Sequence, residues 1–148
     1  MKRFHVIGLA LLAIVAVGAF GAIVAVAHKT KKSVPTTVTM LFTPGEPAGG
    51  SGNIKDGSFS GRVGSTKPPC LQDRTVVVTR VGGPTIGEDK QSDADGSWAV
   101  SIKDPQPTGG EQYTATVLGL KIVKRNDQNH KHIIKCLPVS ETITIPTP

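Results

Sequence analysis

The apolar run from Val6 to Ala27 constrains this chain more than any other feature of its sequence. It holds 22 consecutive residues without a charge, between a basic start (Lys2, Arg3) and a second basic stretch that begins at Lys29. As a helix this run is roughly 33 Å long, close to a bilayer core of about 30 Å. A secretory signal has a shorter apolar region, of about 7 to 15 residues. The length therefore predicts one N-terminal transmembrane helix.

A cleaved signal peptide is the alternative interpretation of the same run. Ala25, Val26 and Ala27 form a small-x-small triplet that signal peptidase can cut, leaving His28 as the first residue. Basic residues flank both ends of the run, so the positive-inside rule does not fix its orientation. The orientation has to be argued from the residues that follow.

The cysteines favour an oxidising compartment. The chain has two, Cys70 and Cys136, and both follow the apolar run. An even pair behind an export signal predicts one disulfide, with two buried free thiols as the alternative. Neither cysteine has the CxxC spacing of a zinc site. We therefore expect a single-pass protein of the cell membrane with its C-terminal domain outside, or a secreted protein if the signal is cleaved.

The net charge of +6 suggests nucleic-acid binding, but its distribution does not. Residues 1–32 hold five basic residues and no acidic one, which leaves 17 − 5 = 12 basic against 11 acidic residues in the rest of the chain. The excess charge is thus assigned to the flanks of the apolar run. This excludes nucleic acid as the expected partner.

The polar part of the chain contains short β-prone runs separated by turn residues. Strands are expected at residues 58–63, 74–81, 85–88, 97–102, 112–118 and 139–145, with two more inside 121–137 joined by a turn at 126–129. Residues 36–42 could form a further short strand, before a Pro/Gly/Ser-rich linker or long loop at 44–53. Trp98, the only tryptophan, is expected in the core near the disulfide.

These patterns predict an all-β protein. The expected organisation is an anchor or uncleaved signal at 1–32, a flexible linker with a possible short strand at 33–56, a single β-sandwich of about seven strands at 57–145, and a tail at 146–148.

Five short motifs point to a family. They are FSGRV from Phe59, CLQDRTVVVTRV from Cys70, IGEDKQSDADGSWAVSI from Ile86, EQYTATV from Glu111 and CLPVSETITI from Cys136. With them, residues 57–145 resemble bacterial domains of the carboxypeptidase-regulatory-like, transthyretin-like group of Ig-like sandwiches. The resemblance implies an Ig-like fold and a non-catalytic module. Such domains are often appended to larger surface or secreted proteins, whereas this one stands alone behind the expected anchor.

Two carboxylates, Asp93 and Asp95, precede Gly96 in an arrangement that can begin a calcium loop. An EF-hand loop counted from Asp93 needs Gly at the sixth position and Glu at the twelfth, where this chain has Trp98 and Asp104. A hairpin turn is therefore the expected structure, because Asp-Gly tolerates the positive φ that such turns require.

A basic cluster lies at residues 121–135, and Asp127 is the one acidic residue within this range. Its members are Lys121, Lys124, Arg125, Lys131 and Lys135. Such a cluster is suited to anionic lipid headgroups or cell-wall polymers, and it is equally typical of a solvated hairpin. His130 and His132 lie within it and would share a face of a strand, but the sequence indicates no third metal ligand.

The sequence contains no GxSxG motif and no other recognisable catalytic set, so we expect no enzyme activity and no cofactor. The hypothesis is a membrane-tethered extracytoplasmic Ig-like module with a structural or interaction role, whose partner is a cell-surface protein or wall polymer. The alternative is a ligand-binding module for wall polymer, saccharide or weakly bound calcium, secreted after signal cleavage.

Overall fold

The computed structural model describes residues 29–45, 56–103, 106–126 and 130–147, and these ranges form ten β-strands and one short 3-10 turn. The predicted transmembrane helix lies outside them. Within them, no helix has the length and apolarity needed to cross a bilayer. The expectation of an all-β fold is confirmed for the part of the chain that the structure describes.

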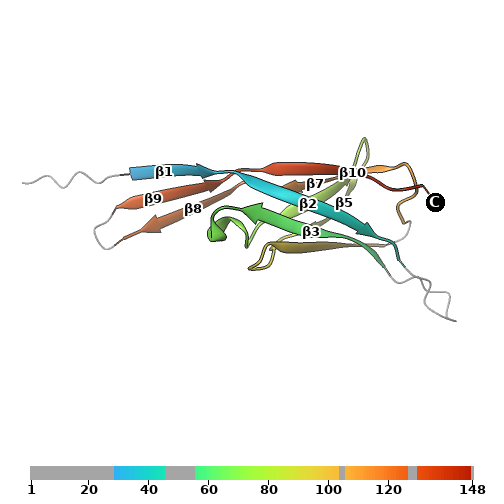
Figure 1. The fold of residues 1–148 in the computed structure, drawn as a ribbon, viewed down its shortest axis with the longest axis horizontal. Coiled ribbons are helices and arrows are strands. Elements are labelled where there is room, and N and C mark those ends of the chain that lie inside the picture. Colours follow the sequence, from blue (N-terminus) through green and yellow to red (C-terminus); the bar gives the residue numbers. More distant parts are fainter. Residues whose placement is uncertain (1–28, 46–55, 104–105, 127–129, 148) are drawn as a thin grey trace, which may run out of the picture.

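Two antiparallel sheets form a sandwich (Figure 1). One has the order β2-β3-β6, made by β2 (Thr36–Thr43), β3 (Gly57–Ser65) and β6 (Ser97–Ile102). The other has the order β10-β7-β4-β5, made by β10 (Val139–Thr144), β7 (Gln112–Val117), β4 (Val76–Arg80) and β5 (Thr85–Asp89). The sheets also touch at their edges, where β2 lies against β10 and β5 against β6.

The core follows from residues that alternate along each strand, because side chains two apart point to the same face of a sheet. At its centre the Phe59 ring lies 4.9 Å from the ring of Tyr113 and 5.3 Å from that of Phe42, measured between centroids. The buried core residues are Val38, Met40, Phe59, Val63, Val76, Val78, Trp98, Val100, Ile102, Tyr113, Ala115, Val117 and Ile145.

A third sheet projects from one end of the sandwich (Figure 1). Its order is β1-β9-β8, made by β1 (Lys29–Val34), β9 (Lys131–Cys136) and β8 (Leu120–Arg125), with β1 parallel to β9 and β8 antiparallel to it. One or two residues separate β1 from β2, β7 from β8 and β9 from β10. The arm is thus an extension of three strands of the sandwich.

A disulfide lies at the base of this arm. Cys70, the last residue of the 3-10 turn η1 (Pro68–Cys70), is bonded to Cys136 at a Cα separation of 5.5 Å. The two cysteines and Val34 form a small buried cluster of their own, against which Leu120, Ile122 and Ile134 pack. The predicted pairing is confirmed. Trp98 is buried as predicted, but it belongs to the main core and not to the disulfide cluster, so its predicted place was wrong.

Arg74 is fully buried at the same junction, with 1% of its surface exposed. Its guanidinium donates hydrogen bonds to the carbonyl oxygens of Cys70 (3.0 Å), Leu118 (2.7 and 3.2 Å) and Leu137 (3.1 Å). Burial lowers the pKa of Arg74 from its usual value. One side chain therefore joins the η1 loop, the β7-β8 connection and the β9-β10 connection.

The strands expected from residue 57 onward all occur in the structure, with ends that differ by up to two residues from the predicted ones. In the described part of the chain the sandwich has seven strands, in line with the predicted count, but their identity differs. β8 and β9, which were expected in the sandwich, pair with the unexpected β1 in the third sheet. β2 pairs with β3 along its full length, so the sandwich begins at Thr36 rather than at Gly57. Most of the predicted linker, residues 46–55, lies outside the described residues.

Candidate functional site

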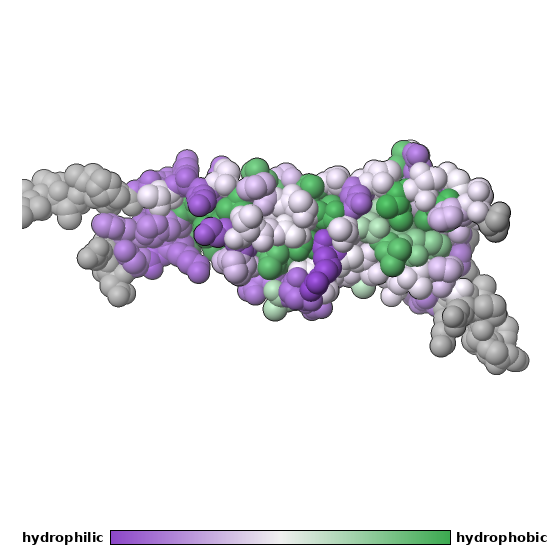
Figure 2. All heavy atoms as spheres, viewed as in Figure 1, coloured by the Kyte–Doolittle hydropathy of each residue, from purple (hydrophilic) through white to green (hydrophobic). Residues whose placement is uncertain are grey.

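The arm carries a concentration of positive charge. Its three strands contain eight lysine or arginine residues and no acidic residue; the eight are Lys29, Lys31, Lys32, Lys121, Lys124, Arg125, Lys131 and Lys135. In Figure 2 the hydrophilic colour gathers over this end of the molecule. We call β1, β8 and β9 the basic arm.

The strand register sorts these charges unequally between the two faces of the arm. Residues paired across the three strands share a face, and the face alternates along each strand. One face, which we call the basic face, carries Lys29, Lys31, Lys121, Arg125, Lys131 and Lys135. The opposite face carries Lys32 and Lys124 together with the apolar residues next to the disulfide.

Apolar side chains occupy the middle of the basic face. Ile133 on the central strand is 4% exposed, and its cross-strand neighbours are Lys31 and Val123. Val123 is 45% exposed. Lysine side chains commonly lay their methylene stems along apolar surface while the ammonium stays in water. The basic face therefore has a small apolar pair, Ile133 and Val123, in its middle row, with cations in the rows on either side and Lys31 at the β1 edge.

The segments that form the sandwich and its loops carry the opposite charge. Residues 36–119 and 137–148 contain seven basic and ten acidic residues, a net charge of 7 − 10 = −3. The structure describes three ion pairs, and none of them uses a cation of the arm. The charge of the arm is thus not neutralised by ion pairs among the described residues.

The basic cluster expected from sequence is brought together on β8 and β9. The structure adds Lys29, Lys31 and Lys32, which sequence reasoning assigned to the flank of the apolar run. Their strand has no apolar alternation, so no pattern within residues 29–34 indicates that it pairs with a strand 102 positions later. In the sequence, a high lysine content is the only feature that residues 29–34 share with β9.

The two histidines also lie in the arm. The Nδ1 atom of His132 is 2.7 Å from the Oγ1 atom of Thr30 on β1, and the backbone N–H of His130 donates to the Oδ1 atom of Asn126 at 2.8 Å. The described residues contain no cluster of three His, Cys, Asp or Glu side chains that would hold a metal ion.

Asp93 and Asp95 lie in the turn that leads into β6. Gly96 donates its N–H to the carbonyl of Asp93 and has φ +88°, and a Cβ on it would lie 2.3 Å from the carbonyl oxygen of Val63. The Oδ1 atom of Asp95 accepts hydrogen bonds from the N–H and hydroxyl of Ser97, and its Oδ2 atom pairs with Arg62. The bonds from Ser97, followed by Arg62, lower the pKa of Asp95 to about 2. The Oδ1 atom of Asp95 therefore stabilises the turn, and its Oδ2 atom joins the turn to β3.

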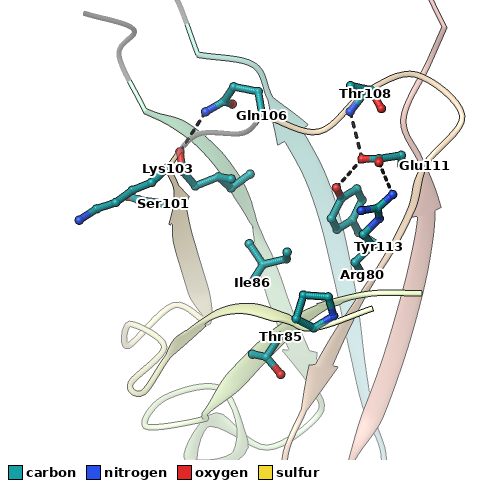
Figure 3. A pocket seen from close by; sticks show the side chains of 11 residues that line it. Arg80, Thr85, Ile86, Ser101, Lys103, Gln106, Thr108, Glu111 and Tyr113 are labelled. Carbon is teal, nitrogen blue, oxygen red and sulfur yellow. Dashed lines mark hydrogen bonds and ion pairs between the residues drawn. The ribbon is translucent and has the colours of Figure 1, made fainter. Parts of the chain in front are cut away.

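A cleft of about 570 Å³ opens at the end of the sandwich opposite the arm (Figure 3). Four of its polar lining residues, Arg80, Thr108, Glu111 and Tyr113, converge on one side (Figure 3). Glu111 accepts hydrogen bonds from the hydroxyl of Tyr113 (2.6 Å) and the N–H of Thr108 (3.1 Å) and pairs with Arg80 at 2.5 Å. These contacts lower the pKa of Glu111. The Oε1 atom of Gln106, also in the lining, is buried without a hydrogen-bond partner among the described residues.

Tyr113 allows a direct test of this cleft, because it is the only tyrosine in the chain. Burial, followed by the bond to Glu111, raises the pKa of Tyr113 to about 12. Its ionisation, followed by ultraviolet difference absorbance, is therefore expected near pH 12 in the folded protein and near pH 10 in urea. Because the pKa of Tyr113 is higher in the folded than in the unfolded protein, its protonated form favours the folded state. This contribution to the free energy of unfolding is complete below about pH 10 and is lost as the pH rises through about 12.

The Glu111→Gln variant should titrate at a lower pH than the wild type but above pH 10, because burial is the larger cause of the shift. A midpoint near pH 10 in the folded wild type would contradict the described environment of Tyr113.

The fold and the arm define an all-β protein with a disulfide-linked basic sheet at one end. In comparisons with known proteins, the chain matches no family model, no curated protein and no solved structure.

Proposed function

We propose that this chain is a membrane-tethered extracytoplasmic module, with an Ig-like, transthyretin-like sandwich, that engages an anionic partner and does not catalyse a reaction. The observation that carries the proposal is the basic arm. Its eight cations come from two distant segments of the chain, and one of these segments begins at Lys29, two positions after the apolar run ends at Ala27.

Three further features support it. The apolar run is long enough to span a bilayer. The disulfide suits an oxidising compartment. In the cleft, Glu111 is the one carboxylate among the described lining residues, and its oxygens are held by the Tyr113 hydroxyl, the Thr108 N–H and Arg80.

The test is the mass of the mature protein isolated from a bacterial membrane, before and after reduction. We expect the full-length mass and a rise of about 2 Da on reduction, for the two hydrogens that a disulfide gains. On intact cells, a membrane-impermeant amine reagent should modify the lysines of the sandwich. Loss of residues 1–27 would indicate a secreted protein, and free thiols or unmodified lysines would contradict the outward orientation.

A further inference from the structure

We propose that the basic face of the arm binds the anionic phospholipid headgroups of the same membrane that holds residues 6–27. This inference rests on the proposed tether and assigns the anionic partner to one chemical class. It differs from the tether itself, which requires only the apolar run.

Chain connectivity places the arm next to the headgroups. Lys29 is the first residue of β1, and His28 alone separates it from Ala27. Two residue steps span at most about 7 Å. The headgroup layer on each side of a bilayer is about 5–7 Å thick. An apolar run that crosses the membrane therefore leaves the start of β1 within or at the edge of this layer.

The row of residues at the start of β1 is wholly cationic. Lys29 pairs with Lys131, and Lys131 pairs with Arg125, so three cations lie side by side on the basic face. Neighbouring strands are about 4.8 Å apart. A guanidinium binds phosphate through two parallel hydrogen bonds, whereas lysine acts as a point charge. The row has the charge and the donors to contact several phosphates.

Two observations favour lipid over a soluble wall polymer. The basic face has an exposed apolar residue, Val123, in its middle row between cations on β8, which suits an interface that is polar outside and apolar beneath. The tether also makes contact with the membrane intramolecular, which raises the effective concentration of headgroups far above that of a free partner.

The experiment uses the full chain in nanodiscs of either phosphatidylglycerol or phosphatidylcholine, and measures the acetylation rate of each lysine by mass spectrometry. In the anionic discs we expect several-fold slower modification of the lysines of the basic face (Lys29, Lys31, Lys121, Lys131 and Lys135). Lys90 and Lys103 of the sandwich should be unchanged, and Lys32 and Lys124 of the opposite face should be protected less. In 1 M salt, where the Debye length falls from about 10 Å to about 3 Å, the protection should be lost.

Two variants with the same change in net charge provide the control. Lys121→Glu/Arg125→Glu/Lys131→Glu reverses three charges of the basic face, and Arg62→Glu/Lys90→Glu/Lys103→Glu reverses three of the sandwich. Protection of Lys29, Lys31 and Lys135 should be lost in the first variant and kept in the second. Fluorescence of Trp98, the only tryptophan, reports whether each variant keeps the sandwich core.

The possible failures are distinguishable. Equal lysine rates in both discs, from a chain that co-purifies with them, would overturn the lipid contact and leave the tether intact. Protection seen only on adding soluble poly(glycerol phosphate) would overturn it in favour of a wall polymer. A chain that co-purifies with neither disc would overturn the tether and this inference together.

Discussion

Replacement of Arg74 by methionine is expected to destabilise the protein by about 3 kcal/mol, because it removes the Arg74 donors from the carbonyl oxygens of Cys70 and Leu118, each at a cost of about 1–3 kcal/mol. The carbonyl of Leu137 keeps the hydroxyl of Thr36 as a donor. Arg74 is 1% exposed and donates to the carbonyls of Cys70, Leu118 and Leu137. Arg74→Lys should recover only part of the loss, since an ammonium cannot reproduce the planar set of donors. Urea unfolding of the full chain in detergent, followed by Trp98 fluorescence, measures both variants.

Arg62→Met is the matched control. Arg62 forms a surface ion pair with Asp95, and the two side chains are 63% and 55% exposed. Exposed pairs of this kind contribute about 0–1 kcal/mol. If Arg74→Met unfolds at the same urea concentration as Arg62→Met, the hydrogen bonds of Arg74 do not hold the junction together.

Loss of the disulfide is the second large effect. The bond closes a loop of 66 residues, and in the chain-entropy model a loop of that length stabilises the fold by about 4 kcal/mol. The double variant Cys70→Ser/Cys136→Ser should lower the free energy of unfolding by about this amount, a large part of the 5–15 kcal/mol typical of a domain. Urea unfolding of oxidised wild type, reduced wild type and the variant provides the measurement.

Hydrogen exchange should show where the disulfide acts. The arm packs on a small cluster that contains both cysteines, whereas the sandwich has its own larger core. When the disulfide is reduced, the amide protons of β1, β8 and β9 should therefore lose protection against exchange before those of β3, β4 and β7. Uniform loss of protection would mean that the arm and the sandwich unfold as one unit.

Most of the sandwich was predictable because each strand carries its own pattern. Trp98, Val100 and Ile102 alternate with polar residues in β6, as do Tyr113, Ala115 and Val117 in β7. The burial of Arg74 was not predicted, because no local sequence pattern indicates it. Arginine is usually exposed, and only the convergence of three chain connections gives this one enough carbonyl partners to be buried.

The candidate site was predictable in part. The lysines of residues 121–135 stood out as a cluster in sequence, while Lys29, Lys31 and Lys32 were attributed to the flank of the apolar run. Their strand lacks alternation, so its place depends on the parallel pairing with β9. The division of cations between two faces also depends on this register, which no local pattern specifies.

The sequence by itself determined the strand-forming runs, the cysteine pair and an apolar run long enough to span a membrane, because these follow from local periodicity, residue type and length. Only the tertiary structure decided that β1 joins β8 and β9 to form the basic arm, and that Arg74 and the disulfide hold its base. Those features depend on contacts between residues far apart in the chain, whose energies come from burial and hydrogen bonds that exist only once the strands are assembled.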